Sequence, residues 1–261
     1  MDQMNRAPLI LFCAAVIVYA VLCFVFLFAQ RSFIYFPTPA RLGVASIIPF
    51  KTRDATLFIS TQPRDTMQAL IYFGGNAEDV SYSFPRFAAA FPDIAIYMMH
   101  YRGYGGSSGR PSESALHTDA KELFKMVQAK HPDVIVVGRS LGSGIAIRLA
   151  SEEPVRRLVL ITPFDSILNI AKRAAPFLPI GLMMQDRYES WRVAPLVRSP
   201  TLIITADNDE IIPASNTAAL FRAFSPGVAT LQTMEGTNHN SISQKPEFME
   251  AIKAWQRVGG M

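Results

Sequence analysis

The fold is decided by the stretch Val134-Ile-Val-Val-Gly-Arg-Ser-Leu-Gly-Ser-Gly-Ile-Ala-Ile147. Its β-branched apolar start predicts a strand buried on both faces, and the small residues that follow predict a helix. Between them, a G-x-S-x-G pattern puts Ser140 on a turn so tight that its flanking positions require glycine. A chance glycine–serine turn is the alternative. The strand before Ser140 and the helix after it favour a nucleophilic serine.

The remainder of the chain repeats this order of strand and helix. Short apolar strands alternate with segments whose apolar residues recur at helical spacing. Such alternation predicts an α/β fold, with a mostly parallel central sheet and helices on both of its faces. The expected strands are 56–60, 69–73, 94–99, 134–137, 157–161, 201–205 and 230–234, and the expected helices are 80–91, 116–127, 143–150, 212–224 and 248–255.

Composition excludes several functional classes. The chain has 261 residues, enough for one large domain, and a net charge of +4 without a long basic run, so we expect no nucleic-acid partner. Both cysteines, Cys13 and Cys23, lie in an apolar N-terminal segment, so the rest of the chain has no disulfide and no thiolate metal site. Because no metal-ligand cluster, phosphate loop or dinucleotide fingerprint is present, we expect neither a metal nor a cofactor.

The N-terminal segment is predicted to be one transmembrane helix. No charge occurs from Leu9 to Ala29, and Arg6 and Arg31 flank the run. At about 1.5 Å per residue the run is ~31 Å long, which matches the hydrocarbon core of a bilayer. A cleaved signal peptide is the alternative, but its apolar region is usually only about 7–15 residues. A lone N-terminal anchor usually leaves its N-terminus in the cytoplasm, which would make the domain extracytoplasmic. Basic residues on both flanks leave the orientation open.

The chain divides into an anchor (1–30), a linker and first strand region (31–55) and a main domain (56–261). Pro37, Pro39 and Gly43 mark the linker. Residues 169–199 interrupt the alternation with several prolines and an apolar run. This excursion is either a small lid over the carboxyl edge of the sheet or a helix packed on the sheet face. The segment 186–191 is expected to begin that packing helix.

A serine hydroxyl is a weak nucleophile at neutral pH and needs a base held in the correct tautomer by a carboxylate. On a sheet of this kind the order along the chain is serine, acid, histidine. His239 satisfies it, because it follows the last strand in a polar loop. His100, at a strand end, is the rival base. His117 and His131 lie in or near a helix and are expected to be solvated.

The acid is expected just after the strand 201–205, where Asp207 and Asp209 stand close together. We favour Asp209, because a turn of a few residues is needed to direct a carboxylate at His239. Asp207 is the second candidate, with a structural role in the turn as its alternative.

An oxyanion hole needs two backbone N–H groups near the reacting carbonyl. The N–H of Leu141, directly after the nucleophile, is one candidate. The other is the N–H of Asn76, since Gly74 and Gly75 allow the backbone to come close. A plain Gly-Gly turn is the alternative.

The joint set of motifs resembles membrane-anchored α/β-hydrolases of the serine-aminopeptidase-like (S33) type, and within them the group that includes palmitoyl-thioesterase-like hydrolases. The resemblance implies an α/β-hydrolase fold and supports Asp209 as the acid. This chain departs from the family pattern at one place: the family usually has His-Gly where this chain has Gly74-Gly75. The change removes a side chain that braces the loop. The motifs are 30–37 (QRSFIYFP), 75–77 (GNA), 101–105 (YRGYG), 108–112 (SGRPS), 138–142 (GRSLG), 209–213 (DEIIP) and 236–240 (GTNHN).

Together these features predict a membrane-anchored serine hydrolase with the triad Ser140, Asp209 and His239. The apolar run 177–184, close to a bilayer, favours acyl esters or thioesters, and hence a small-molecule or lipid-like acyl substrate. Two alternatives stay open: a peptidase or amidase of the S33 type, and a catalytically silent α/β-hydrolase fold that serves as a binding protein. Nothing in the sequence predicts an oligomeric state.

Overall fold

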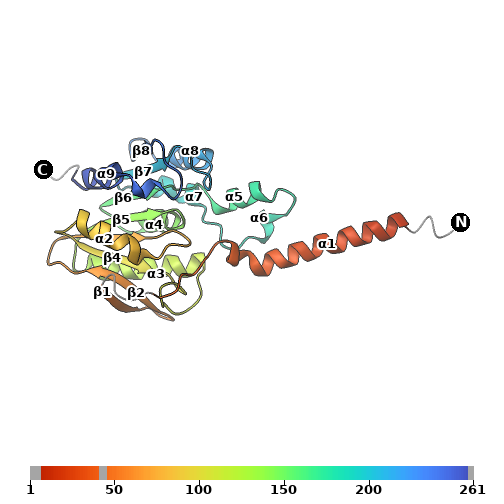
Figure 1. The fold of residues 1–261 in the computed structure, drawn as a ribbon, viewed down its shortest axis with the longest axis horizontal. Helices are drawn as coiled ribbons and strands as arrows, with labels where there is room; N and C mark the ends of the chain where they lie inside the picture. The colour runs from red at the N-terminus through yellow and green to blue at the C-terminus, as the bar shows by residue number, and fades with distance from the viewer. Residues whose placement is uncertain (1–6, 41–45, 258–261) are drawn as a thin grey trace.

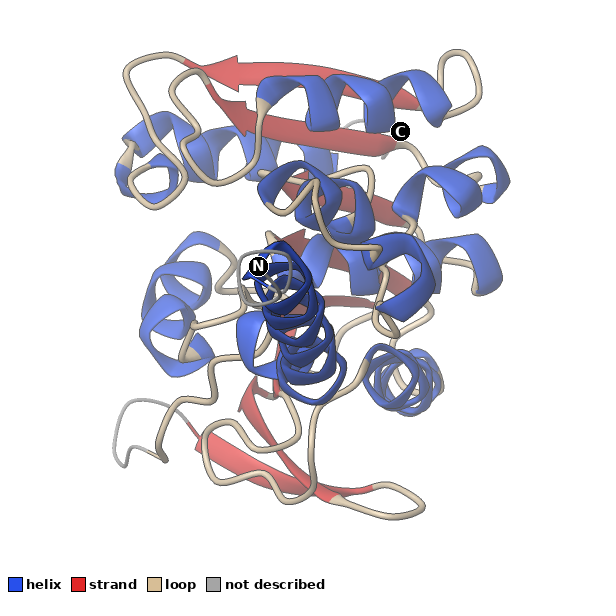
Figure 2. Cartoon of the chain, turned by 90° about the vertical axis from the view of Figure 1, so that its right-hand side faces the viewer, coloured by secondary structure: helices blue, strands red, loops and turns tan. Residues whose placement is uncertain are grey.

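The computed structural model describes residues 7–40 and 46–257, so Arg6, Arg41 and Gly43 lie outside the described residues. A mostly parallel sheet of eight strands, in the order β1-β2-β4-β3-β5-β6-β7-β8, forms the centre of the domain (Figures 1 and 2). The pairs β1–β2 and β2–β4 are antiparallel and the others are parallel. The strands are β1 Ser46–Lys51, β2 Thr56–Gln62, β3 Gln68–Phe73, β4 Ala95–His100, β5 Asp133–Arg139, β6 Arg157–Ile161, β7 Thr201–Ala206 and β8 Ala229–Met234.

Helices cover both faces of this sheet, because the central strands have apolar side chains on both sides. One apolar core lies under α2 and α9 and includes Phe84, Phe87 and Phe248. The other lies under α3, α4 and α8 and includes Leu123 and Ile145. The domain helices are α2 Val80–Ala90, α3 Glu113–Gln128, α4 Leu141–Glu152, α5 Ile167–Ala174, α6 Ile180–Met183, α7 Ser190–Val193, α8 Ala214–Ala223 and α9 Pro246–Arg257.

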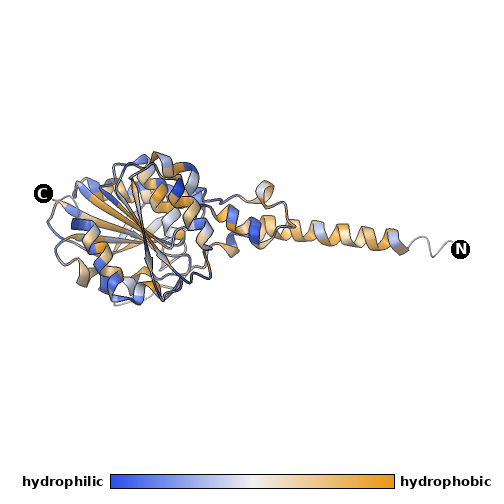
Figure 3. Cartoon of the chain, turned by 90° about the horizontal axis from the view of Figure 1, so that it is seen from above, coloured by the Kyte–Doolittle hydropathy of each residue, from blue (hydrophilic) through white to orange (hydrophobic). Residues whose placement is uncertain are grey.

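The helix α1, Ala7–Ala29, projects from the domain and is apolar along its length (Figure 3). It is long and apolar enough to cross a membrane, although a signal sequence near an N-terminus has the same properties. None of its residues is buried. The expected anchor therefore corresponds to one continuous helix.

The expected linker is packed on the domain in its described part. A short 3-10 helix, Gln30–Phe33, follows α1 directly, and Gln30, Ile34 and Tyr35 are buried. The Tyr35 hydroxyl donates to Asp186 Oδ2 (3.1 Å), and the Arg31 guanidinium pairs with the same carboxylate (2.9 Å). These contacts fix the end of α1 to the domain.

In the excursion at 169–199, α5 and α6 extend away from the sheet beside α1, whereas α7 packs on α4 and α8 (Figure 1). The expectation that a helix begins at Asp186 is wrong, because α7 starts at Ser190. Asp186 is instead buried as the partner of Tyr35 and Arg31, and Tyr188 adopts a positive φ of 44°. Side-chain contacts with distant residues fix the conformation of both residues, and local helical propensity contains no information on such contacts.

Candidate active site

Ser140 stands at the turn between β5 and α4. Its φ of 49° and ψ of −116° are unusual for a residue other than glycine, so the surrounding structure has to hold the strained backbone in place. The Ser140 N–H donates to the Ile161 carbonyl of β6 (2.9 Å). The turn lifts the hydroxyl from the carboxyl edge of the sheet, as the strand–glycine–serine–helix pattern predicts.

The glycines around Ser140 are required by lack of space. A Cβ at Gly138 would lie 2.4 Å from the Gly142 carbonyl oxygen, and one at Gly142 would lie 2.1 Å from the Phe73 carbonyl oxygen. A side chain at Gly138 would force β5 away from α4, and one at Gly142 would force α4 away from the end of β3. The close approach of backbone to backbone explains why the sequence has glycine at both positions.

Ser140, His239 and Asp209 form a continuous chain of hydrogen bonds. His239 Nε2 lies 3.0 Å from Ser140 Oγ, and His239 Nδ1 lies 2.9 Å from Asp209 Oδ2. The side chains of His239 and Asp209 are only 7% and 4% exposed. The loops after β5, β7 and β8 thus bring together the three residues expected from the sequence, in the geometry of a nucleophile, a base and an orienting carboxylate.

Asp209 is held as a carboxylate. Burial favours its neutral form, but the hydrogen bond to His239 and the N–H groups of Ile211 and Ile212 keep the pKa of Asp209 below its ordinary value. Both N–H groups donate to Oδ1, at 2.9 and 2.7 Å. This loop therefore fixes the direction of the carboxylate toward the imidazole.

Asp207 has a structural role in the turn, which was the alternative to its being the catalytic acid. Its carboxylate accepts the N–H groups of Gly236 (2.8 Å) and Thr237 (2.9 Å), which lower its pKa. These residues begin the loop that carries His239. Asp207 consequently ties the acid loop to the histidine loop without contacting the imidazole.

The glycine loop after β3 lies beside Ser140. A Cβ at Gly75 would come within 3.8 Å of Ser140 Cβ. The Asn76 carbonyl accepts hydrogen bonds from Phe36 N–H (3.1 Å) and the Tyr104 hydroxyl (2.6 Å), which anchor the loop from behind. Among the described residues, no hydrogen bond uses the N–H of Asn76 or Leu141 as donor, so both expected oxyanion donors remain available.

Glu78 braces this loop, and sequence reasoning missed it. Its Oε2 accepts the Gly75 N–H (2.8 Å) and pairs with Arg139 (3.2 Å), while Oε1 accepts the hydroxyls of Tyr72 (2.8 Å) and Ser83 (2.6 Å). Since Arg139 is the variable residue of G-x-S-x-G before the serine, the carboxylate joins the glycine loop to the elbow. The brace expected to be lost with Gly74-Gly75 is thus supplied by Glu78. A lone acid three residues after a Gly-Gly pair gave too little signal to single it out.

The other histidines lie away from Ser140. His100 is buried, bonds Ser60 Oγ through Nε2 (2.8 Å), and has a pKa lowered by burial. His117 contacts Glu113 (3.7 Å). The expectation that His131 is solvated is wrong: it is buried between the Tyr97 hydroxyl and the Thr66 carbonyl. The chain folds the end of α3 back onto β3 and β4, a tertiary contact that its position at a helix end did not predict.

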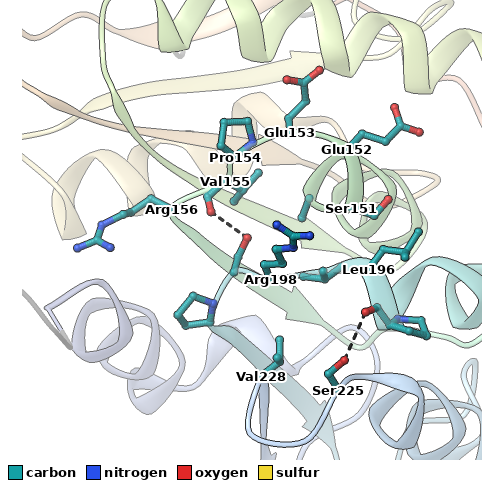
Figure 4. Close-up of a pocket in the computed structure, with 15 residues that line it drawn as sticks. Ser151, Glu152, Glu153, Pro154, Val155, Arg156, Leu196, Arg198, Ser225 and Val228 are labelled. Atoms are coloured by element: carbon teal, nitrogen blue, oxygen red, sulfur yellow. Dashed lines mark hydrogen bonds between the residues drawn. The ribbon is translucent and has the colours of Figure 1, made fainter.

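Two further features bear on the chemistry. Within 7–40 and 46–257, no group of three histidine, cysteine or acidic side chains could hold a metal ion. The most prominent hollow, of about 1060 Å³, is lined by residues such as Glu153, Arg156 and Arg198 at the amino ends of β6 and β7 (Figure 4). Because Ser140 lies at the carboxyl end of β5, this hollow is not the substrate site.

Comparisons with known proteins agree with this fold. A family model described as the alpha/beta hydrolase fold matches residues 68–179. An uncharacterized protein of Mycobacterium tuberculosis is 28% identical over 242 residues, which cover 85% of this chain and 83% of the relative. Protein bem46 of Schizosaccharomyces pombe is 25% identical, with 86% of this chain and 81% of the relative covered.

Solved structures give the same result at the level of the fold. An esterase of Pyrococcus furiosus matches with a TM-score of 0.69 and 15% identity, covering 85% of this chain and 96% of the esterase. A monoacylglycerol lipase of Paleococcus ferrophilus matches with a TM-score of 0.59 and 17% identity, covering 76% and 97% of the two chains. The family match, the curated relatives and the sheet topology agree at the level of the fold, and the chain has the α/β-hydrolase fold.

Proposed function

We propose that this protein is a membrane-anchored serine hydrolase that cleaves acyl esters or thioesters through an acyl-serine intermediate. The observation that carries the proposal is the pair of contacts from His239, to Ser140 Oγ at 3.0 Å and to Asp209 Oδ2 at 2.9 Å. Three residues from three loops with this geometry suit nucleophilic catalysis and have no evident packing purpose.

In the proposed first half-reaction, Ser140 Oγ attacks the carbonyl carbon of the acyl group while His239 Nε2 takes the hydroxyl proton. The carbonyl oxygen becomes an oxyanion, which the N–H groups of Leu141 and Asn76 stabilise. His239 then gives its proton to the leaving alkoxide or thiolate as the bond from the acyl carbon breaks. Asp209 keeps Nδ1 protonated throughout and stabilises the imidazolium.

In the second half-reaction, water replaces the alcohol or thiol. His239 takes a proton from the water, whose oxygen attacks the acyl carbon of acyl-Ser140. Collapse of this second oxyanion releases the carboxylic acid, and Ser140 Oγ regains its proton from His239. Neither half-reaction calls on a metal or cofactor.

The anchor in this proposal is residues 1–30, followed by the linker and first strand region 31–55 and the hydrolase domain 56–261. Contacts from the end of α1 to the domain support an uncleaved helix. The Gln30 side chain is buried and donates to the Met183 carbonyl (3.2 Å), and its Oε1 accepts the Gln185 N–H (2.7 Å). Within α1 itself, the Tyr19 hydroxyl donates to the Phe177 carbonyl (3.0 Å), a contact that a leader removed after export does not need. We further propose that the domain is extracytoplasmic, which protease protection of intact cells tests.

The preference for acyl esters or thioesters over aminoacyl amides rests on the apolar excursion next to α1. The esterase and lipase named above share only the fold at 15% and 17% identity, so they do not select a substrate. Hydrolysis of p-nitrophenyl esters, acyl thioesters and aminoacyl amides by the full chain, with Ser140→Ala as control, tests the proposal. If aminoacyl amides are cleaved best, the protein is a peptidase or amidase. If no substrate is cleaved and a fluorophosphonate probe leaves Ser140 unlabelled, it is a binding protein.

A further inference from the structure

The excursion, residues 169–199, forms hydrogen bonds with the N-terminal region at two positions along the axis of α1. At the domain end of α1, the Gln30 side chain bonds Met183 and Gln185. Further along α1, the Tyr19 hydroxyl donates to the Phe177 carbonyl (3.0 Å). Figures 1 and 3 both show the excursion running beside the domain end of α1. The two contacts fix how far the excursion reaches along the helix.

The distance between these two contacts along α1 gives the depth of Phe177 in a bilayer that α1 would span. Tyr19 lies eleven residues before Gln30, which at about 1.5 Å per residue is ~16 Å along α1. The helix has 23 residues, and a span needs about 20, so its placement in a bilayer can shift by only ~5 Å. Phe177 therefore lies at a level inside the hydrocarbon core wherever α1 is placed as a transmembrane helix.

The chemistry of the excursion agrees with this depth. The run from Ala174 to Met184 has no charged residue. Phe177 is 64% exposed and Leu182 is 88% exposed, an unfavourable state for large apolar side chains in water. Like the side chains of α1, they are large apolar groups that the domain leaves exposed.

The charged side chains nearest to this run are Lys172 and Arg173 before it and Asp186 and Arg187 after it. Arg187 folds back and donates to the carbonyls of Gly181 (2.8 Å) and Met184 (3.0 Å), and Lys172 also lies beside Gly181. Arg173 donates to Ser215 Oγ (2.8 Å) and Asn216 Oδ1 (2.9 Å) of α8. Asp186, at the other end, pairs with Arg31 (2.9 Å), which directly follows Gln30. The charges thus lie at the level of α6 and Gln30, where α1 meets the domain, and the turn 174–179 with Phe177 extends beyond them.

We propose that residues 174–179 are immersed in the hydrocarbon core of the bilayer beside α1, and that lipid acyl chains cover Phe177, while Leu182 lies at the membrane surface. The inference rests on the proposed anchoring by α1 and extends it from one helix to a second, re-entrant segment. Its backbone can enter lipid because the N–H groups of Ala175 and Leu178 donate to the carbonyls of Ala171 (3.0 Å) and Ala175 (3.1 Å). The pairing of Tyr19 with the Phe177 carbonyl likewise removes one donor and one acceptor from the lipid.

The immersed segment gives the hydrolase domain a second attachment, close to its site. The excursion begins directly after β6, where Asp165 and Ser166 stand near the carboxyl edge that carries Ser140. Its tip is in lipid, and its base is attached to the sheet. Acyl chains that enter along the excursion would therefore approach the serine from the membrane.

Spin labels on the full chain in lipid nanodiscs test the immersion. In a Cys13→Ala, Cys23→Ala background, single labels are placed through Phe177→Cys and Leu182→Cys. Val18→Cys is the reference in α1, and Leu196→Cys, 61% exposed beside the hollow of Figure 4, is the matched apolar control. Collision with oxygen reports lipid, and collision with a water-soluble nickel chelate reports water. Thermal unfolding confirms that each variant is folded.

The label at 177 should match Val18 and show on the order of tenfold lower nickel-chelate collision than Leu196, because the chelate is excluded from hydrocarbon. The label at 182, next to Met183 at the domain end of α1, should give a value between those of 177 and Leu196. If Val18 is in lipid while 177 resembles Leu196, the immersion is overturned and the anchoring stands. If Val18 itself is in water, both the anchoring and the immersion are overturned.

Discussion

The Glu78 carboxylate lies 3.2 Å from the Arg139 guanidinium, and this ion pair joins the glycine loop to the nucleophile turn. Both side chains are largely buried, at 9% and 16% exposed. Because Glu78 also accepts the Gly75 N–H (2.8 Å), the position of the proposed donor at Asn76 depends on a charged pair that lies outside the triad. Glu78 is thus a positioning residue.

Replacing Glu78 should slow the chemical step and leave substrate binding nearly unchanged. We expect Glu78→Ala to lower kcat about 100-fold, as the loss of one oxyanion donor does, with little change in KM. Glu78→Gln, which keeps an acceptor for Gly75, should lose only about tenfold. Steady-state kinetics on a soluble ester measure both. Glu250→Gln, on the exposed side of α9, is the control. A rise in KM at constant kcat would contradict the positioning role.

The two candidate acids should separate in kinetics. Asp209→Asn leaves His239 in the wrong tautomer, so kcat should fall by about 10⁴-fold. Asp207→Asn keeps one oxygen for Gly236 or Thr237, so the expected loss is about tenfold or less, accompanied by a lower Tm. Equal losses in kcat for the two variants would show that the contact between Asp209 and His239 is not what matters.

Asp209 should also make folding stability depend on pH. Its pKa is lower in the folded chain than its ordinary value of about 3.9, so its ionised form contributes stability above that pH, and the contribution disappears as pH falls through the folded pKa. On acidification from neutral pH to about pH 3, the unfolding free energy of the wild type should therefore decrease relative to that of Asp209→Asn. Urea unfolding at each pH measures it. A difference independent of pH would show that the carboxylate gains nothing from its partners.

The glycine at position 142 should be irreplaceable for steric reasons. A Cβ there would overlap the Phe73 carbonyl at 2.1 Å, whereas one at Gly227 meets nothing within 4 Å although φ is +80°. Gly142→Ala should cost about 3 kcal/mol or more, and Gly227→Ala about 1–2 kcal/mol from backbone strain alone. Thermal unfolding compares them. Similar costs would mean that the turn can open to admit a side chain.

Most of the sheet and the three residues of the proposed triad were predictable from sequence, because both depend on local signals. Apolar runs such as Val134–Val137 predict buried strands, and Ser140 and Asp209 each follow such a strand. His239 follows the last strand, Ala229–Met234, which is mostly exposed. The antiparallel position of β2 beside β4, the burial of His131 and the brace at Glu78 depend on contacts between distant segments. Pattern and propensity contain no information on those contacts.

The same limit applies to the N-terminal region. Hydropathy alone predicted the apolar helix, and Pro37 and Pro39 marked a linker after it, but the burial of Tyr35 within that linker was not predicted. The partner of Tyr35 is Asp186, 151 residues away. No local pattern could have paired them.

The central claim, that Ser140 is acylated, is tested most directly by the intact mass of the full chain mixed rapidly with a p-nitrophenyl acyl ester and quenched in acid. The account predicts one added acyl group, assigned by peptide mapping to Ser140, that disappears as hydrolysis finishes and never forms in Ser140→Ala. Turnover of the ester without any adduct, or an adduct of the same yield in Ser140→Ala, would contradict it.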